Sequence, residues 1–285
     1  VKVKEKRLGK AIIYHIVVFI IGVIMIYPLL WMVMSSFKET GTIFTTAGSL
    51  IPETFTLENY TNGWKGFAKV PFSAFFKNSM LISVLATLGT IMSSALVAYG
   101  FARFKFFGHN ILFAAMLVTM MLPAQVLMIP QYLWYQKLGW VGTYLPLIVP
   151  YFFATQGFFV YMISNFIGGI PKELDEAAKI DGCTFFQTYR LVIVPLLKPV
   201  MATIALLSFR QGWNEYILPL VFTMTNDKLR PLTVGVNMLK NAGDGAAAWN
   251  IMFAGATIAI IPMLITYCIF SRYFMGGMTT GAVKG

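Results

Sequence analysis

Pro171 to Pro195 reads PKELDEAAKIDGCTFFQTYRLVIVP and is the longest polar interruption in the second half of a very apolar chain. A helix is predicted to begin at Pro171, because proline in a first helical turn loses no hydrogen bond. Gly182 suits a left-handed helix end, and Thr184 with Gln187 has the spacing of a capping box that begins a second helix. Pro195 is expected to bend or end that second helix. The pattern predicts two short helices joined at a glycine, which form either a solvated loop or a docking surface.

The composition of the chain is that of a membrane protein. Hydrophobic residues make up 58% of the 285 residues and charged residues only 12%, whereas soluble domains carry about 25% charged residues. The net charge is +11, but the basic residues are scattered at the ends of apolar runs. That pattern is typical of topology signals rather than of a phosphate-binding stripe. We therefore expect an integral protein in contact with membrane lipid and no nucleic-acid partner.

Six apolar runs predict the architecture. Each is long enough to cross a bilayer as a helix, so the predicted fold class is an all-α membrane protein with six transmembrane helices. A basic N-terminal segment, residues 1–10, precedes one transmembrane domain, residues 11–285, and the excess of Lys and Arg on that side predicts that both termini are cytoplasmic. The first run is too long for a signal peptide, so we expect it to be retained. The runs cover residues 11–37, 76–104, 110–129, 143–167, 194–222 and 249–274.

The charged segment 171–195 also resembles a known signature. Glu176-Ala177-Ala178 is followed after three residues by Gly182 and after nine more by Val192-Ile193-Val194-Pro195. This spacing resembles the cytoplasmic coupling motif, an EAA triplet with a glycine and an apolar-x-apolar-Pro ending, of ABC-importer permeases. The family usually has Ile and Leu in place of the two valines, and these exchanges keep the surface apolar. A spaced signature of this length is far more specific than a lone glycine pattern.

Further stretches resemble the carbohydrate-uptake, maltose-type branch of these permeases, and the likeness covers nearly the whole chain. They are Leu57-Glu58-Asn59-Tyr60, Tyr99-Gly100-Phe101-Ala102-Arg103, Trp213-Asn214-Glu215, Pro195-Leu196-Leu197-Lys198-Pro199 and the tail 281–285. The resemblance implies the fold of a type I ABC importer permease in a bacterial inner (cytoplasmic) membrane. It also implies a second permease subunit, two copies of a cytoplasmic ATP-binding subunit, an extracytoplasmic solute-binding protein and an oligosaccharide or related sugar as substrate.

The same resemblance assigns the residues that couple transport to ATP hydrolysis. This chain has no Gly-x-x-x-x-Gly-Lys-Ser/Thr loop, so we expect no catalytic residue, no cofactor and ATP hydrolysis only in the partner subunits. Cys183 and Cys268 lack an accompanying ligand cluster, so neither a disulfide nor a metal site is expected. The implied coupling residues are Glu176, Ala177, Ala178, Asp181, Gly182 and Pro195.

Polar residues within the predicted spans are candidates for the substrate path. Two charges and two amides in the fifth span are costly unless they face partners or water. Arg210 and Asn214 are expected to share one helical face, and Gln211 and Glu215 the neighbouring face. Two interpretations stay open, a translocation path and a buried network that fixes packing against a partner subunit. The candidates, which include groups able to bind a sugar in other spans, are Gln125, Tyr132, Gln156, Arg210, Gln211, Asn214 and Glu215.

Other functions were weighed against an importer. An ion-driven secondary transporter would normally show internal repeats with interrupted helices and an intramembrane acid; Glu215 could serve as that acid, but no clear repeat is visible. A membrane enzyme would need paired carboxylates, a histidine cluster or a nucleophile motif, which are not evident. Aromatic residues in the polar loop 38–75 are either anchors at headgroup level or part of a docking surface for a solute-binding protein. The sequence leaves the particular sugar open.

Overall fold

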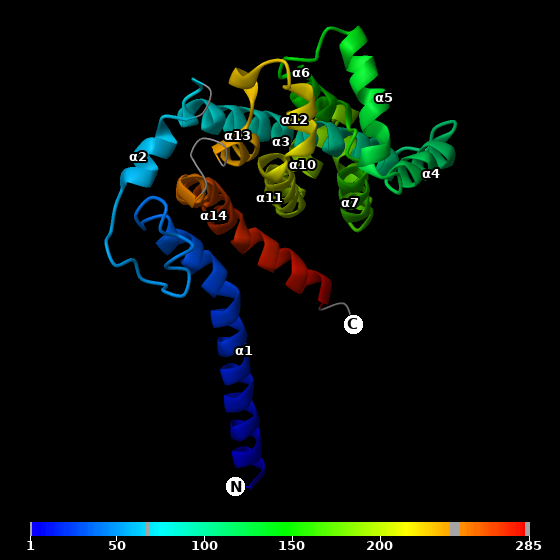
Figure 1. Cartoon of the computed structure of the whole chain (residues 1–285). Helices are drawn as coiled ribbons and strands as arrows, with labels where there is room; N and C mark the ends of the chain where they lie inside the picture. Colours follow the sequence, from blue (N-terminus) through cyan, green and yellow to red (C-terminus); the bar gives the residue numbers. More distant parts are fainter. Residues whose placement is uncertain (1, 67–68, 240–245, 283–285) are drawn as a thin grey trace. The chain divides into compact units, whose positions relative to one another are not determined.

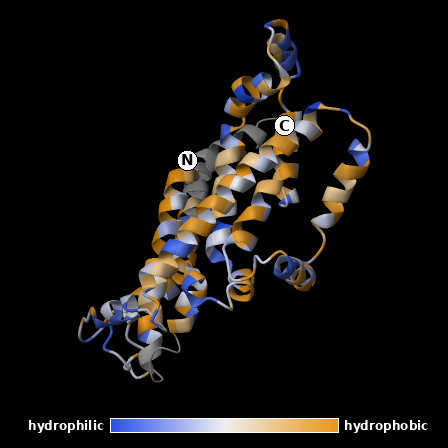
Figure 2. Cartoon of the chain, turned by 90° about the horizontal axis from the view of Figure 1, so that it is seen from above, coloured by the Kyte–Doolittle hydropathy of each residue, from blue (hydrophilic) through white to orange (hydrophobic). Residues whose placement is uncertain are grey.

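The computed structural model describes residues 2–66, 69–239 and 246–282, which form helices joined by turns and loops (Figure 1). Contacts divide the chain into two units, one of residues 1–72 and 236–260 and the other of residues 73–235 and 261–285. Hydrophobic residues predominate along the long helices, and hydrophilic residues are more frequent at helix ends and in the connections (Figure 2). Such a distribution suits helices that cross a bilayer. A helix can do so because its backbone hydrogen bonds are satisfied within the helix itself.

The first unit contains α1 (Lys2–Ser35), α2 (Glu58–Trp64) and the beginning of α14 (Ala246–Ala282). The loop between α1 and α2 folds around two buried side chains. Asn59 donates hydrogen bonds from Nδ2 to the carbonyl oxygens of Ser36 and Lys38, at 3.0 and 2.7 Å. Lys38 donates from Nζ to the carbonyl oxygens of Thr46 and Ser49, at 2.7 and 2.8 Å, and its burial lowers the pKa of the ammonium group. These bonds give the loop a defined shape without regular secondary structure.

The second unit is built around the long helix α3 (Phe72–Arg103). Its core joins small residues of α3, such as Ala95 and Ala98, to apolar side chains from later parts of the unit, including Ile163, Ile193 and Ile204.

The remaining described elements of the chain are α4 (His109–Thr119), α5 (Ala124–Lys137), α6 (Leu145–Ile148), η1 (Val149–Phe153), α7 (Gly157–Gly168), α8 (Glu173–Ile180), α9 (Phe185–Thr188), the π-helix η2 (Tyr189–Ile193), α10 (Val194–Leu196), α11 (Lys198–Asn214), α12 (Ile217–Phe222), η3 (Asp227–Leu229) and α13 (Leu232–Leu239).

Three of the predicted spans are not continuous helices, and one of them, 143–167, divides into α6, the 3-10 helix η1 and α7, with residues 154–156 between η1 and α7. The run 110–129 divides into α4 and α5, which meet at 104°. Pro123 explains the break, because it has no backbone N–H and adopts an extended conformation before α5. The run 194–222 is also interrupted: the helix Phe185–Leu196 meets α11 at 75°, and α11 ends at Asn214. Hydropathy did not reveal these bends because the residues on both sides are apolar.

Among the residues that the structure describes, four helical stretches are long and apolar enough to cross a membrane, or up to six if each bent pair forms one span. The six-span arrangement therefore stays a prediction. The four are Ala11–Ser35, Phe72–Arg103, Leu145–Gly168 and Trp249–Ser271, and each lies close to a predicted run.

Gly235 on α13 provides a test of the packing around α3. A Cβ at this position would lie 2.5 Å from Cγ of Phe75, whose ring is fully buried. The substitution Gly235→Ala therefore forces the ring to move, and such overpacking costs about 1–3 kcal/mol. We expect a lower Tm for the variant in thermal unfolding of the detergent-purified protein.

The matched control is Gly100→Ala on α3, where a Cβ would meet no described atom within 4 Å. Loss of a helical glycine stabilises by up to about 1 kcal/mol, so the Tm of this variant should stay level or rise. A Gly235→Ala protein as stable as the Gly100→Ala protein would show that Gly235 is not tightly packed.

Candidate functional site

The charged segment forms two short helices joined at a glycine, as the sequence predicted. The first helix, α8, begins at Glu173 rather than at Pro171, which lies before the capping residue Lys172. Glu173, Asp175 and Glu176 occupy its first turn, where negative charge stabilises the positive end of the helix dipole. The prediction thus placed the helix start two residues early, within the usual uncertainty of helix ends.

The link between the two helices has the predicted stop and start signals. Gly182 has φ +80°, and the N–H of Cys183 donates to the Ala178 carbonyl oxygen at 2.9 Å, so carbonyl groups at the end of α8 are satisfied. The capping box is confirmed. Thr184 N–H donates to Gln187 Oε1 at 2.7 Å, and Gln187 N–H donates to Thr184 Oγ1 at 3.3 Å. The angle between the helices is therefore set by hydrogen bonds at both sides of the glycine.

Pro195 lies inside the second helix and does not end it. The helix runs from Phe185 to Leu196 through α9, the π-helical turn η2 and α10, and its 75° bend toward α11 follows Leu196. Pro195 cannot donate a backbone hydrogen bond, and the wider π turn ends at Ile193, two residues before it. The predicted bend is therefore present, two residues beyond the proline.

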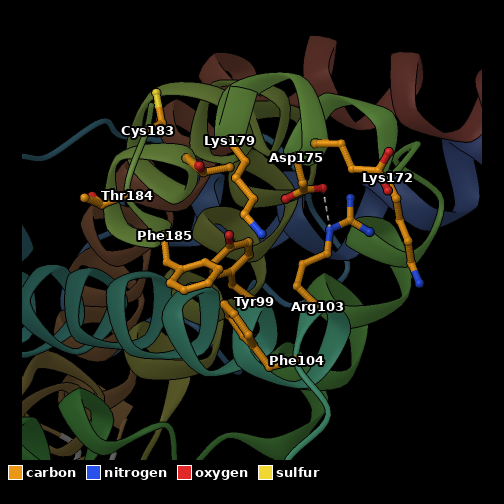
Figure 3. A pocket seen from close by; sticks show the side chains of 11 residues that line it. Tyr99, Arg103, Phe104, Lys172, Asp175, Lys179, Cys183, Thr184 and Phe185 are labelled. Atoms are coloured by element: carbon orange, nitrogen blue, oxygen red, sulfur yellow. Dashed lines mark ion pairs between the residues drawn. The ribbon is translucent and has the colours of Figure 1, made fainter. Parts of the chain in front are cut away.

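An ion pair joins the segment to the end of α3 (Figure 3). Arg103 Nε lies 2.9 Å from Asp175 Oδ2, and the side chains are only 6% and 21% exposed. Arg103 also donates from Nη2 to the carbonyl oxygen of Ile170 at 3.0 Å. This pair was not predicted from the sequence, although a basic residue at the end of an apolar run and acids in the charged segment are both visible there. Local patterns do not reveal which distant charges meet.

A pocket of about 450 Å³ lies beside the ion pair, between the end of α3 and the two short helices (Figure 3). Aromatic rings form part of its wall: the centroid of Phe104 lies 5.5 Å from that of Tyr99 and 5.2 Å from that of Phe185. Charged side chains of both signs line the rest, namely Arg103, Lys172, Asp175, Glu176 and Lys179. Glu176 is the only one of the predicted coupling residues among those that line this pocket.

The segment carries exposed apolar side chains despite its charge. Ile180 is 86% exposed, and Phe185 and Phe186 are 67% and 63% exposed, although Phe185 also lines the pocket. Ala178, by contrast, is buried. Exposed large apolar groups on a short, ordered turn are typical of a protein interaction surface.

Three of the predicted path residues lie together. Arg210, Gln211 and Asn214 line one cavity of about 410 Å³ with Phe158, Phe159 and Leu207. Glu215 does not share a helical face with Gln211, because α11 ends at Asn214 and Glu215 is extended. That expectation is therefore wrong.

The remaining path candidates have other surroundings. Glu215 Oε1 accepts hydrogen bonds from the backbone N–H groups of Tyr216, Ile217 and Leu218 at 3.2, 3.1 and 3.4 Å. Its carboxylate thus caps the beginning of α12. Tyr132 stacks on Phe222 with a centroid distance of 6.3 Å, Gln156 precedes α7, and Gln125 is exposed on α5. Within the described residues, no group of three or more His, Cys, Asp or Glu side chains could hold a metal ion.

The capping role of Glu215 predicts a local effect of substitution. Glu215→Ala removes the acceptor of three backbone N–H groups, and loss of a helix cap costs about 0.5–2 kcal/mol. We expect faster hydrogen exchange of the amides of Tyr216, Ile217 and Leu218 than in the unaltered protein. Glu215→Gln keeps a carbonyl acceptor and should retain most of the protection. Equal exchange in both variants would contradict the capping role.

Comparisons with known proteins agree with this architecture. Residues 86–279 match the family model described as "Binding-protein-dependent transport system inner membrane component". The chain is 33% identical to "Probable ABC transporter permease protein YurM" of Bacillus subtilis (strain 168), with 100% of this chain and 93% of the relative covered. It is also 33% identical to "Trehalose/maltose transport system permease protein MalG" of Thermococcus litoralis, with 97% and 98% covered.

A solved structure shows the same fold. One chain of a bacterial ABC transporter involved in the import of the acidic polysaccharide alginate superposes with a TM-score of 0.80 and covers 93% of this chain and 96% of its own length. The sequence identity is 21%, so this likeness concerns the fold alone. The predicted all-α class is confirmed.

Proposed function

The chain belongs to the family of binding-protein-dependent transport system inner membrane components, and from this premise we propose that it is the permease subunit of an ATP-driven importer of an oligosaccharide or related sugar. The sugar class is supported by the relative whose name gives trehalose and maltose as its substrates. The alternative of an ion-driven secondary transporter has no comparable support. The protein would reside in a bacterial inner membrane with six spans and both termini in the cytoplasm.

The coupling segment carries the proposal. A first helix that ends at a left-handed glycine and a second helix that begins with a capping box form a short ordered turn with exposed apolar side chains. We propose that Glu176, Ala177, Ala178, Asp181, Gly182 and Pro195 belong to the surface through which a cytoplasmic ATPase acts. Two copies of the ATPase subunit would serve this chain and a second permease, and closure of the ATPases would drive the change between inward-open and outward-open states.

The loop between α1 and α2 is the proposed docking region for the solute-binding protein. Buried Lys38 and Asn59 hold its backbone in place. Large apolar side chains, by contrast, are exposed along it: Phe44, Ile51, Phe55 and Leu57 are all more than half exposed. A pre-ordered loop loses little conformational entropy on binding, which suits a partner that must bind and leave in every cycle.

The polar end of α11 is the proposed substrate path. Arg210, Gln211 and Asn214 share a cavity with the aromatic side chains Phe158 and Phe159, and hydroxyl-rich sugars need polar groups beside aromatic faces. Glu215 would act on this path by fixing the break between α11 and α12. Gln125, Tyr132 and Gln156 stay candidates from neighbouring elements.

Gly182 allows a sharp test of the coupling segment, because Gly108 is a matched control. The two glycines have φ +80° and +79°, and a Cβ at either meets no described atom within 4 Å. Alanine in this conformation costs roughly 1–2 kcal/mol at both positions. A larger effect on transport at Gly182 must therefore come from the coupling surface rather than from local strain.

We expect Gly182→Ala to reduce uptake by about tenfold or more, equivalent to about 1.4 kcal/mol in a rate, while the amount of protein in the membrane is unchanged. Gly108→Ala should keep near-normal uptake. The assay is uptake of radiolabelled trehalose or maltose, or of the first oligosaccharide in a panel that the unaltered system transports. Equal uptake by the two variants would refute the coupling assignment.

A further inference from the structure

The two halves of the coupling segment are attached to α3 in different ways. The second half is packed into the core: Ile193 is fully buried in the cluster around Ala95 and Ala98 of α3, and the ring of Tyr189 lies 5.2 Å from that of Tyr99. The first half, α8, packs mainly against its own neighbours α9 and η2. Its polar link to α3 is the Arg103–Asp175 ion pair.

From this difference we infer that Arg103 and Asp175 are positioning residues that transmit movement of α8 to α3 during transport. The inference rests on the proposed coupling function of the segment and deepens it. Arg103 holds α8 through Asp175 and holds the end of the α7 connection through the carbonyl oxygen of Ile170. One guanidinium group therefore fixes α8 and the residue that precedes the segment at the same time, and α3 must follow when they move.

The physical character of the pair suits transmission better than stabilisation. Transfer of two charges out of water is costly, so a buried ion pair adds little net stability compared with apolar side chains of similar volume. The guanidinium group is also held in place by the hydrogen bond that its Nη2 donates to the carbonyl oxygen of Ile170, so the ion pair acts from a fixed position. With side chains 6% and 21% exposed, the pair is shielded enough to persist at cellular salt concentrations.

The adjacent pocket strengthens this argument. About 450 Å³ of open space lies between α8 and the end of α3, so apolar packing does not fill this part of the contact. Loss of the ion pair would leave α8 free to move into that space without disturbing the core around Ile163 and Ile193. Removal of the ion pair should therefore leave the fold of this unit intact.

The test uses the whole importer in proteoliposomes, with the ATPase, the second permease and the solute-binding protein, and measures sugar uptake and ATP hydrolysis together. Asp175→Asn and Arg103→Gln should each lower the ratio of uptake to ATP hydrolysed by about tenfold, within the range of coupling between contacting residues. The charge exchange, Arg103→Asp with Asp175→Arg, should raise the ratio above that of either single variant but only part of the way to normal, because it re-forms the ion pair and loses the hydrogen bond to the Ile170 carbonyl oxygen. A merely structural role would lower the amount of complex and both rates in parallel, and would leave the ratio unchanged.

The matched control is Asp227→Asn, which makes the same substitution in a second ion pair of the described residues, Arg230 Nη2 to Asp227 Oδ1 at 2.8 Å. It should leave the ratio unchanged. If the neutral variants of the buried pair do not accumulate in the membrane, the ratio is measured for Arg103→Lys instead. This variant keeps the positive charge but lacks the guanidinium group that holds Asp175 and Ile170 together. A normal ratio in Arg103→Lys would then overturn the inference.

The outcomes separate this inference from the proposed function. Gly182→Ala in the same assay reports on coupling through the segment as a whole. If Gly182→Ala loses uptake while single variants of the ion pair keep a normal ratio, or if the charge exchange rescues nothing, only the role of the pair is wrong. If Gly182→Ala also behaves normally, the coupling function itself fails.

Discussion

Within the hydrocarbon of a bilayer no water is available to backbone N–H and C=O groups, so the protein must satisfy them itself. Continuous helices do this without help, and every interruption needs another group. In this chain, side chains supply the missing partners at two helix interruptions, one in a predicted span and one in the polar segment outside the spans. In the span, Glu215 accepts hydrogen bonds from three N–H groups where α11 gives way to α12. In the polar segment, Thr184 with Gln187 caps the helix that follows Gly182. The interruptions are therefore built features, and they coincide with the regions to which we assign transport.

The charged segment 171–195 is joined to the long helices α3 and α11 in two ways. One route is the chain itself, because the helix Phe185–Leu196 bends directly into α11, whose far end carries Arg210, Gln211 and Asn214. The other is the ion pair of Asp175 with Arg103 at the end of α3. A force applied to the exposed surface around Ile180 would act on both helices together. Because the segment is attached to both α3 and α11, its movement would shift the two helices together, which neither attachment alone would do.

The sequence was sufficient for the features that depend on local chemistry. The all-α class followed from composition, and the turn at Gly182 and the capping box at Thr184 followed from residue type and spacing. The bend at Pro123 was missed as a break because hydropathy is similar on both sides of it. The Arg103–Asp175 pair was missed because its partners are distant in the sequence. Likewise, Glu215 was placed on a helical face since nothing in the local pattern showed that α11 ends one residue before it.

The most direct measurement of the central claim is affinity purification of this chain from its native membrane in mild detergent, followed by mass spectrometry of the proteins that accompany it. The account predicts a second permease chain and an ATPase with a phosphate-binding loop. Recovery of the chain alone, or only with copies of itself and without an ATPase, would contradict the account.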